Sequence, residues 1–290
     1  MAKVKTFKTI FPAVSVPLND DYSINEPEFR AYLRWIKSFY GKGIEGLVCN
    51  GHTGEITGLT RAERKRVVEI CSEECGDVMT IISGVNCENT AESIAMAKEA
   101  KEAGADGILL MPPHMWLRFG MNPNAPFEYV KDVAEGADID IIIHLYPATS
   151  KAFYPVETLI KMCKEIDHVK CIKMGTRVTS IYEHDVRLLR QECPDISLIT
   201  CHDETLCVSW FPGMDGALIG FAGCVPELIC PAWDVFKNPD KHTLKEAQDW
   251  SNRIYHISQA IYGGGQPSGE AHARLKEALK QRGIFTSALM

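Results

Sequence analysis

The chain has 290 residues, of which 46% are apolar and 24% charged, and its net charge is −7. This length suits one large α/β domain with a substantial core. The acidic balance and the scattered Lys and Arg residues exclude a basic surface for nucleic acid or an anionic membrane. No apolar run approaches the roughly 18 residues that a membrane-spanning helix needs.

Eleven cysteines are scattered along the chain, and no two of them have C-x-x-C spacing. An odd number of scattered cysteines in a chain of this size indicates free thiols in a reducing compartment. Cys71 and Cys75 stand at i, i+4 in a predicted helix, which predicts two half-buried thiols. The N-terminal stretch has too short an apolar core for a signal peptide, so we expect a cytoplasmic protein.

Strand-like apolar runs alternate with amphipathic helix-like runs along most of the chain. The runs are apolar on both faces, as buried parallel strands are. The expected strands cover residues 11–18, 44–50, 80–85, 107–113, 140–146, 169–175, 196–201 and 216–221. The expected helices lie near residues 26–40, 60–75, 89–103, 123–135, 155–165, 180–191, 204–211 and 226–236. Eight strand–helix units with short connections predict an α/β fold, a closed (β/α)8 TIM barrel.

A helical tail follows the last unit, near residues 240–261 and 268–281, and it is interrupted by GGGQPSG at 263–269. No linker separates this tail from the rest of the chain. We therefore expect a catalytic barrel over residues 1–236 and a C-terminal helical extension of the same domain over residues 237–290.

The active site of a TIM barrel lies at the carboxyl ends of its strands. The corresponding ends of the predicted strands carry a lysine, a tyrosine, a glycine-rich turn and four histidines. These residues are Lys173, Tyr146, the turn Gly51–Glu55, His52, His114, His144 and His202. The rim of the predicted barrel thus collects side chains that can bind a substrate and move protons.

Lys173 stands near the end of the apolar strand VKCIKMG. One interpretation is a rim lysine whose ammonium reaches solvent. The other is a Schiff-base nucleophile, because desolvation in a barrel mouth lowers the pKa of a lysine and leaves the amine free to attack a ketone. From the strand alone the two interpretations have equal weight.

Tyr146 ends the fifth predicted strand, and its phenol is either a rim aromatic or a proton carrier. His144 shares a face with Tyr146, one layer deeper, since side chains two residues apart point the same way. Such a histidine is more often a core residue with satisfied hydrogen bonds. His52 is a candidate helper, because a histidine has a pKa suited to acid–base work near neutrality.

The turn GHTGE has glycines that permit close backbone approach, so its N–H groups and the Thr53 hydroxyl can hold a carboxylate. The rim histidines His52, His114, His144 and His202 also raise a metal-site alternative. Neither H-x-H nor H-E-x-x-H spacing occurs among them, and no carboxylate triad accompanies them. We expect neither a metal nor a cofactor.

Three of these motifs, in this order, resemble the dihydrodipicolinate synthase / N-acetylneuraminate lyase family of Schiff-base aldolases. GHTGE is similar to its G-x-[ST]-G-E turn, HLYPATSKAF to its strand-end tyrosine and IKMG to its lysine strand. The similarity covers residues 8–236 and extends to the helical tail. It implies that Lys173 forms an imine with pyruvate or another 2-oxo acid, and that Tyr146 relays protons.

The resemblance also implies substrate-binding positions. Thr53, with the backbone of Gly54, would hold the substrate carboxylate, and the main chain at Leu218 would line the site floor. Three positions differ from the synthase, which has a threonine at His52, a tyrosine near His114 and an arginine at Lys151. We expect these three residues to shape the pocket of the second substrate.

Trp116 and His202 are similar to residues of a neighbouring branch, the hydratase-aldolases, which cleave aryl-substituted 2-oxo acids. In this interpretation Trp116 stacks on a ring and His202 serves hydration; otherwise Trp116 packs at a subunit contact. The sequence thus predicts a metal-independent aldolase or lyase for a 2-oxo acid and an aldehyde. A hydratase-aldolase, a sugar-acid dehydratase, the synthase itself, a metal-dependent lyase and a non-catalytic carboxylate-binding barrel stay open.

The resemblance further implies a homo-oligomer, a tetramer built from two dimers. We expect neither nucleic acid nor a membrane among its partners.

Overall fold

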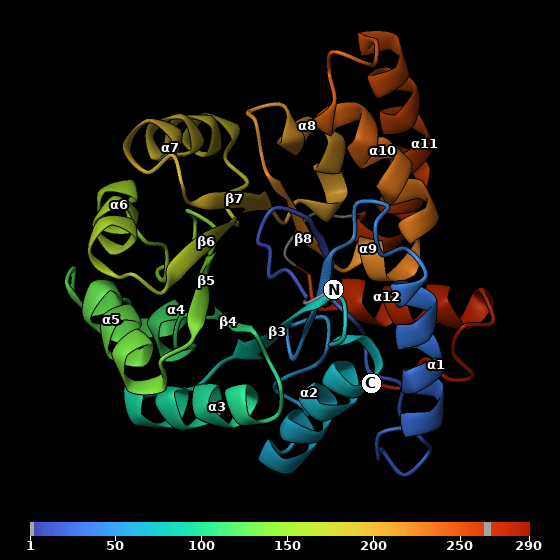
Figure 1. Ribbon diagram of the computed structural model, residues 1–290, viewed down its shortest axis with the longest axis horizontal. Helices are drawn as coiled ribbons and strands as arrows, with labels where there is room; N and C mark the ends of the chain where they lie inside the picture. The colour runs from blue at the N-terminus through green and yellow to red at the C-terminus, as the bar shows by residue number, and fades with distance from the viewer. Residues whose placement is uncertain (1–2, 264–267) are drawn as a thin grey trace.

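The computed structural model of the protein describes residues 3–263 and 268–290. Eight strands form one parallel sheet in the order β1-β8-β7-β6-β5-β4-β3-β2 (Figure 1). The strands are β1 (Ile10–Pro12), β2 (Gly46–Cys49), β3 (Thr80–Val85), β4 (Gly107–Leu110), β5 (Asp140–Leu145), β6 (Val169–Met174), β7 (Ser197–Thr200) and β8 (Gly216–Ile219). The sheet closes where Ala13 bridges to Val48, next to β1 and β2. The TIM barrel predicted from the sequence is confirmed.

Helices surround the barrel and cover its outer face (Figure 1). The barrel helices are α1 (Glu26–Lys37), α2 (Arg61–Cys75), α3 (Thr90–Glu102), α4 (Met115–Phe119), α5 (Ala125–Ala137), α6 (Val156–Glu165), α7 (Thr179–Glu192), η1 (Asp203–Thr205), α8 (Leu206–Trp210), α9 (Phe221–Cys224) and α10 (Pro226–Lys237). Two further helices, α11 (Leu244–Tyr262) and α12 (Glu270–Gln281), follow. Helix α11 packs on α10 and η1, and α12 packs on α9 and α11.

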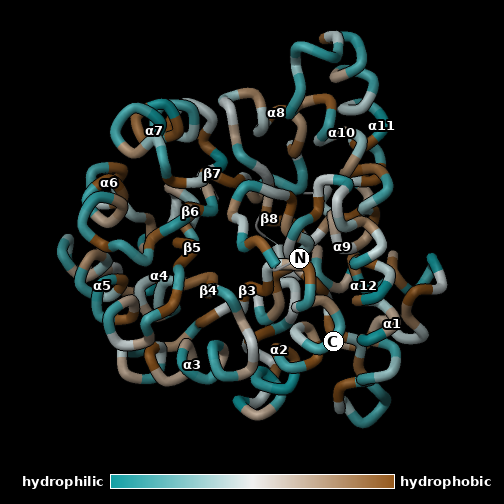
Figure 2. The backbone as a smooth tube through the Cα atoms, viewed as in Figure 1, coloured by the Kyte–Doolittle hydropathy of each residue, from teal (hydrophilic) through white to brown (hydrophobic). Residues whose placement is uncertain are grey.

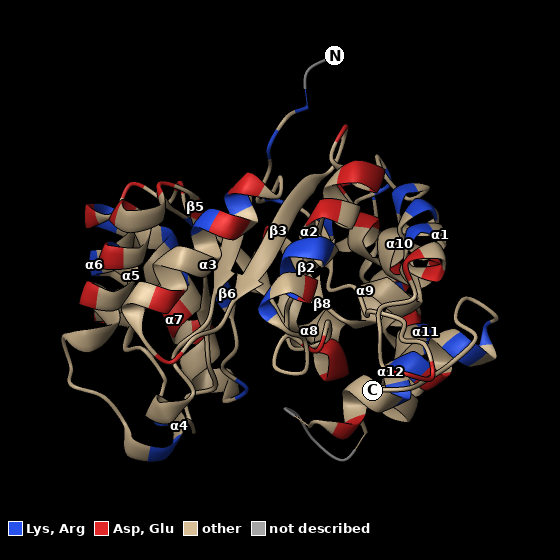
Figure 3. Ribbon diagram, turned by 90° about the horizontal axis from the view of Figure 1, so that it is seen from below, with Lys and Arg blue, Asp and Glu red and all other residues tan. Residues whose placement is uncertain are grey.

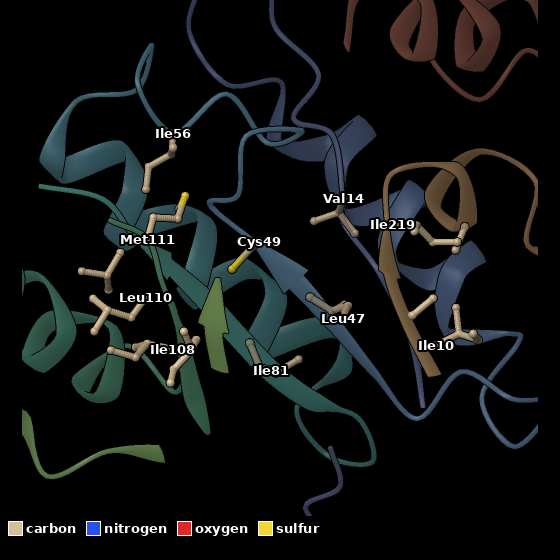
Figure 4. Packing of buried hydrophobic residues seen from close by; sticks show 14 of the residues in the cluster. Ile10, Val14, Leu47, Cys49, Ile56, Ile81, Ile108, Leu110, Met111 and Ile219 are labelled. Atoms are coloured by element: carbon tan, nitrogen blue, oxygen red, sulfur yellow. The ribbon is translucent and has the colours of Figure 1, made fainter. Parts of the chain in front are cut away.

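The period of two along each strand separates two hydrophobic clusters. On β2, Val48 points into the barrel, whereas Leu47 and Cys49 point toward the helices. The inner cluster holds Phe11, Ala13, Val48, Ile82, Leu109, Ile142, Cys171, Ile199 and Leu218. Figure 4 shows part of the outer shell around residues such as Leu47, and Figure 2 shows hydrophobic segments gathered along the strands.

Charged residues of both signs are interspersed along the outer helices (Figure 3), as the scattered charges of the sequence predict. In the described ranges, no helix is long and apolar enough to cross a membrane. All eleven cysteines lie in the described part of the chain and are free thiols. Cys71 and Cys75 are fully buried, so the expectation of two half-buried thiols is wrong. Both face the packed interface between α2 and its neighbours rather than its edge.

Expected and observed elements agree closely in the barrel, with ends that differ by a few residues. The expected strand over 11–18 is an exception, because β1 ends at Pro12 and the following residues lead into a loop. The short helices α4 and α9 are absent from the predicted set, since four or five residues are too few for a periodic pattern. Part of the predicted break at 263–269 lies outside the described residues.

Candidate active site

Lys173 lies in β6 and points into the mouth of the barrel. It is two residues beyond Cys171, which belongs to the inner cluster, so both side chains lie on the inner face. In the sheet it is paired with His144 of β5 and Ile199 of β7. Lys173 lines a cavity of about 140 Å³ at the carboxyl ends of the strands. Burial lowers the pKa of its ammonium, and the nearby Arg177 charge lowers it further.

Tyr146 directly follows β5 and lines the same cavity. Its hydroxyl lies 3.2 Å from His52 Nε2 and 3.3 Å from His114 Nε2. Burial raises the pKa of Tyr146, so its hydroxyl is protonated at neutral pH. The phenol therefore holds a proton that it can share with two imidazoles.

His52 is uncharged near neutral pH, contrary to the expectation from its ordinary pKa. Burial lowers the pKa of His52 to about 3, and the nearby Lys173 charge acts in the same direction. Its imidazole can exchange a hydrogen bond with Tyr146, but it does not carry a titrating proton near pH 7. The sequence missed this because burial of a loop residue depends on the packed barrel mouth.

His144 lines the cavity beneath Tyr146, and the two ring centroids lie 4.9 Å apart. The side chain is buried, and its Nδ1 has no hydrogen-bond partner within the described residues. The expectation of a core histidine with satisfied hydrogen bonds is therefore wrong. Burial lowers the pKa of His144 well below its usual value, which leaves a neutral imidazole in the cavity wall.

The turn that carries Thr53 is held at both ends in the left-handed backbone region. Asn50 has φ of 52° and Glu55 has φ of 55°, which is uncommon for residues other than glycine. The Asn50 side chain donates to the Arg64 carbonyl at 2.9 Å. A Cβ at Gly54 would lie 3.0 Å from the Val14 carbonyl oxygen, so glycine permits the close approach.

Thr53 and His52 line the cavity from this turn, opposite the main chain that ends β8. Leu218 and Gly220 line it from the β8 side. A Cβ at Gly220 would lie 3.2 Å from Thr53 Cγ2, so the two segments meet closely at this point. Thr53 of the expected carboxylate cradle and Leu218 of the expected site floor thus lie in one cavity.

Another wall of the cavity comes from residues that the sequence reasoning did not select. Tyr262 of α11 and His272 of α12 line it, together with Asp203 after β7. The Tyr262 hydroxyl is buried beside the Asp203 carboxyl, and the two groups interact. Burial raises the pKa of Asp203 to about 6, although its carboxylate accepts a hydrogen bond from the Phe221 N–H at 2.9 Å.

Two signals could have drawn attention to this wall. Asp203 falls in the run that follows the seventh strand, where barrel active sites collect polar groups. Tyr262 and His272 flank the glycine-rich break in the helical tail, which marks a change of direction in the chain. Neither signal says which helix face turns toward the barrel.

Five of the expected substrate-binding residues do not line this cavity, namely Gly54, His114, Trp116, Lys151 and His202. The Trp116 ring packs edge-on against Tyr129 and Tyr154, with centroid separations of 5.6 and 6.3 Å. The Lys151 ammonium donates to the Arg118 carbonyl at 2.9 Å. The His202 ring packs against Tyr182, and it lines a neighbouring cavity between α7 and α8. Their place in a substrate complex stays a prediction.

The histidines of the rim do not form a metal site in this part of the chain. Within residues 3–263 and 268–290, no three His, Cys, Asp or Glu side chains come together as metal binding requires. The His52 and His114 rings instead stack at 5.9 Å, on either side of the Tyr146 hydroxyl.

The sequence model of the dihydrodipicolinate synthetase family matches residues 6–290. The chain belongs to this family. Its members are carbon–carbon lyases that act on pyruvate, and this chain is a lyase of that family. The resemblance found in the motifs is confirmed.

Two curated relatives illustrate the family. A DapA-like lyase of Pyrococcus horikoshii, described as uncharacterized, is 30% identical over 86% of this chain and 82% of its own length. A 4-hydroxy-tetrahydrodipicolinate synthase of Bartonella bacilliformis is 26% identical over 93% of this chain and 87% of its own.

Solved structures of the family have the same fold. YagE, a prophage protein from E. coli K12 solved in complex with pyruvate, matches with a TM-score of 0.86. The match covers 99% of this chain and 92% of that chain at 20% identity. At this level of identity the likeness is one of fold.

Proposed function

We propose that this member of the dihydrodipicolinate synthetase family is a metal-independent aldolase that forms a Schiff base with pyruvate or another 2-oxo acid. The observation that carries the proposal is the position of Lys173, whose pKa is lowered by burial, in a cavity that Tyr146 and Thr53 also line. A lysine must be unprotonated to attack a ketone, and desolvation favours the neutral amine.

The reaction begins when the Lys173 amine adds to the keto carbon of the 2-oxo acid. The resulting carbinolamine loses water to give an iminium ion. During cleavage of a 4-hydroxy-2-oxo acid, the C4 hydroxyl loses its proton and the C3–C4 bond breaks. Its electron pair enters the iminium, which gives an enamine and releases the aldehyde. Protonation of C3 and hydrolysis then release the 2-oxo acid and the free amine.

Tyr146 is proposed to move the protons of these steps. Its hydroxyl lies 3.2 Å from His52 Nε2 and 3.3 Å from His114 Nε2. Burial raises the pKa of the phenol, so its proton is transferred more easily when hydrogen bonds to neighbouring groups stabilise the phenolate. The two imidazoles can make such hydrogen bonds.

The turn around Thr53 is proposed to hold the carboxylate of the 2-oxo acid. Its backbone conformation is fixed at Asn50 and Glu55, and Thr53 faces the cavity that contains Lys173. Hydrogen bonds from the Thr53 hydroxyl and from the N–H groups of Gly54 and its neighbours would place the keto carbon at the amine.

The cavity favours a small aliphatic second substrate. Its volume of about 140 Å³ is below the roughly 300–1,000 Å³ of pockets for drug-sized ligands. The alternative of a hydratase-aldolase for aryl-substituted 2-oxo acids depends on Trp116 and His202. Both rings pack against other aromatic residues, so this arrangement does not favour it. A sugar-acid dehydratase uses the same iminium chemistry and differs only in the bond that the enamine electrons break.

Borohydride trapping tests the proposal. The protein is incubated with pyruvate and NaBH4, digested and examined by mass spectrometry. We expect a reduced pyruvate adduct on Lys173. The variant Lys170→Met serves as a control, because Lys170 lies in the same strand but is exposed; it should be labelled as the wild type is. An unlabelled Lys173 in the folded wild-type protein would exclude the Schiff-base mechanism.

We also propose that the protein acts in the cytoplasm as a homotetramer. The eleven free thiols support a reducing compartment. Light scattering coupled to size-exclusion chromatography measures the mass in solution, and a monomer mass at micromolar concentration would contradict the assembly.

A further inference from the structure

Lys276 of α12 is an ammonium group placed almost entirely inside the protein. Only 1% of its side chain is exposed, and it forms an ion pair with Glu55, whose side chain is 13% exposed. Lys276 also donates to the Leu289 carbonyl. Burial lowers the pKa of Lys276 and raises that of Glu55, and the pairing of the two groups opposes both shifts.

A buried ion pair of this kind needs a reason other than stability. Desolvation of two charges costs as much as their attraction returns, so apolar residues of similar size often stabilise a fold equally well. The pair fixes the position of α12 relative to the barrel mouth, because it connects Lys276 in the helix to Glu55. The two residues are distant in the sequence and meet only through the tertiary fold.

That point of the barrel mouth is the end of the turn that carries Thr53. The Glu55 N–H donates to the His52 carbonyl at 3.0 Å, and the Glu55 carbonyl accepts from the Gly58 N–H at 2.8 Å. Glu55 also has φ of 55°, a conformation that its own side chain does not favour. Fixing the Glu55 carboxylate therefore fixes the backbone that leads out of the turn.

The same face of α12 reaches the cavity itself. His272 lies one helical turn before Lys276 and lines the cavity with Lys173. Leu275 packs against the end of β8, where a Cβ at Gly220 would lie 2.8 Å from Leu275 Cδ1. The helix thus contacts the site at two places and is joined to the turn at a third.

We propose that Lys276 is a positioning residue for substrate binding: through Glu55 it holds the turn of Thr53 in the shape that binds the carboxylate of the 2-oxo acid. This inference rests on the proposed function. It makes the C-terminal extension a part of the active site, although Lys276 itself does not touch the substrate.

The double variant Glu55→Gln/Lys276→Met tests the proposal, because it removes both charges and leaves no unpaired one buried. Exchange of the pyruvate methyl protons in D2O, followed by NMR, gives kcat and KM without an aldehyde. We expect KM for pyruvate to rise about tenfold while kcat changes by less than about threefold. Lys280→Met, an exposed change on the same helix, should leave both constants unaltered.

Hydrogen exchange measured by mass spectrometry on peptides that contain residues 51–56 gives a readout that does not depend on catalysis. We expect faster exchange in the double variant than in Lys280→Met. Unchanged KM with unchanged exchange would overturn the proposal, and so would a fall in kcat at constant KM.

Misfolding of the variant and failure of the proposed function give different results. If the double variant does not fold, the single change Glu55→Gln is measured in the same way, and a failure of both to fold would show a structural role only and overturn the proposal. If the wild type neither exchanges nor traps pyruvate, the proposed function fails, whereas the hydrogen-exchange comparison still decides whether Lys276 holds the turn.

Discussion

The active-site cavity has two walls with different origins. One wall comes from β6 and the end of β5, and it carries Lys173, which is paired in the sheet with His144, and Tyr146, which directly follows β5. The other comes from α11 and α12 and carries Tyr262 and His272. The strand wall carries the residues proposed as nucleophile and proton carrier, whereas the helix wall lines the cavity from the C-terminal extension. The two walls thus belong to different parts of the fold.

The two walls also differ in the groups that face their buried hydroxyls. In the strand wall the Tyr146 hydroxyl lies beside two imidazoles. In the helix wall the Tyr262 hydroxyl interacts with Asp203, whose pKa burial raises to about 6.

The largest effect is expected in the strand wall, for Tyr146→Phe. Loss of the hydroxyl removes the proton carrier, so kcat for pyruvate proton exchange should fall by roughly 10²- to 10⁴-fold. Tyr154→Phe is the control, because Tyr154 is also buried but packs against Trp116. Equal rates for the two variants would remove Tyr146 from the mechanism.

The pH dependence of adduct formation tests the other member of the strand wall. Because burial lowers the pKa of Lys173, the trapping rate at low pyruvate should rise about tenfold per pH unit and level off below the ordinary lysine value of about 10.4. The fraction of reactive amine is lost as pH falls through the lowered pKa. A midpoint at or above the ordinary value would contradict the burial of the amine.

Asp203→Asn links the two walls. The folded-state pKa of Asp203 is raised from 3.8 to about 6, so its contribution to stability is lost as pH rises through that range. The asparagine variant should therefore be more stable than the wild type by about 1 to 3 kcal/mol above pH 6 and should lose this advantage near pH 4. Urea unfolding at the two pH values measures the difference.

The same variant should also lower the midpoint of Lys173 titration, because the Asp203 carboxylate favours the charged ammonium. Together the two measurements show whether Asp203 acts on the nucleophile as well as on stability. A pH-independent stability difference would show that the carboxyl is not protonated in the folded protein.

The smallest effect is expected for the hydroxyl of the helix wall. Tyr262→Phe removes a buried hydroxyl that interacts with Asp203 and lowers the pKa of that carboxyl, so it should destabilise the fold by about 1 kcal/mol or less, mainly above pH 6 where Asp203 is charged. Tyr182→Phe is the comparison, since the Tyr182 hydroxyl donates to the Ser209 carbonyl at 2.9 Å. It should destabilise the fold by about 1 kcal/mol at either pH. Melting curves with the same pH dependence for both variants would contradict the interaction of Tyr262 with Asp203.

The sequence predicted the strand wall because strand periodicity is local. Apolar residues on both faces identified β5 and β6 and placed Lys173 near the end of β6. The rule that active sites lie at the carboxyl ends of barrel strands then selected Tyr146 and the turn of Thr53. Their placement in one cavity agrees with that reasoning, and their chemical roles stay predictions.

The side chains outside the cavity show where such reasoning ends. Trp116 and His202 follow strands that do lead to the rim, yet their rings pack against Tyr154 and Tyr182. Trp116 lies in the short helix α4 and His202 directly before η1, and the conformation of these connections decides the direction of each side chain. The near-neutral pKa expected for His52 differs from the structure for a related reason. Burial lowers that pKa, and burial depends on neighbours that pack only in the folded barrel.

The sequence by itself determined the barrel, the strand that carries Lys173 and the order of the motifs around its mouth, because hydrophobic periodicity and turn residues act over a few positions. Only the tertiary structure decided that Tyr262 and His272 line the cavity and that Lys276 pairs with Glu55. The face of α12 that meets the barrel depends on how the whole extension docks, and a buried ion pair between Lys276 and Glu55 exists only after that docking has taken place.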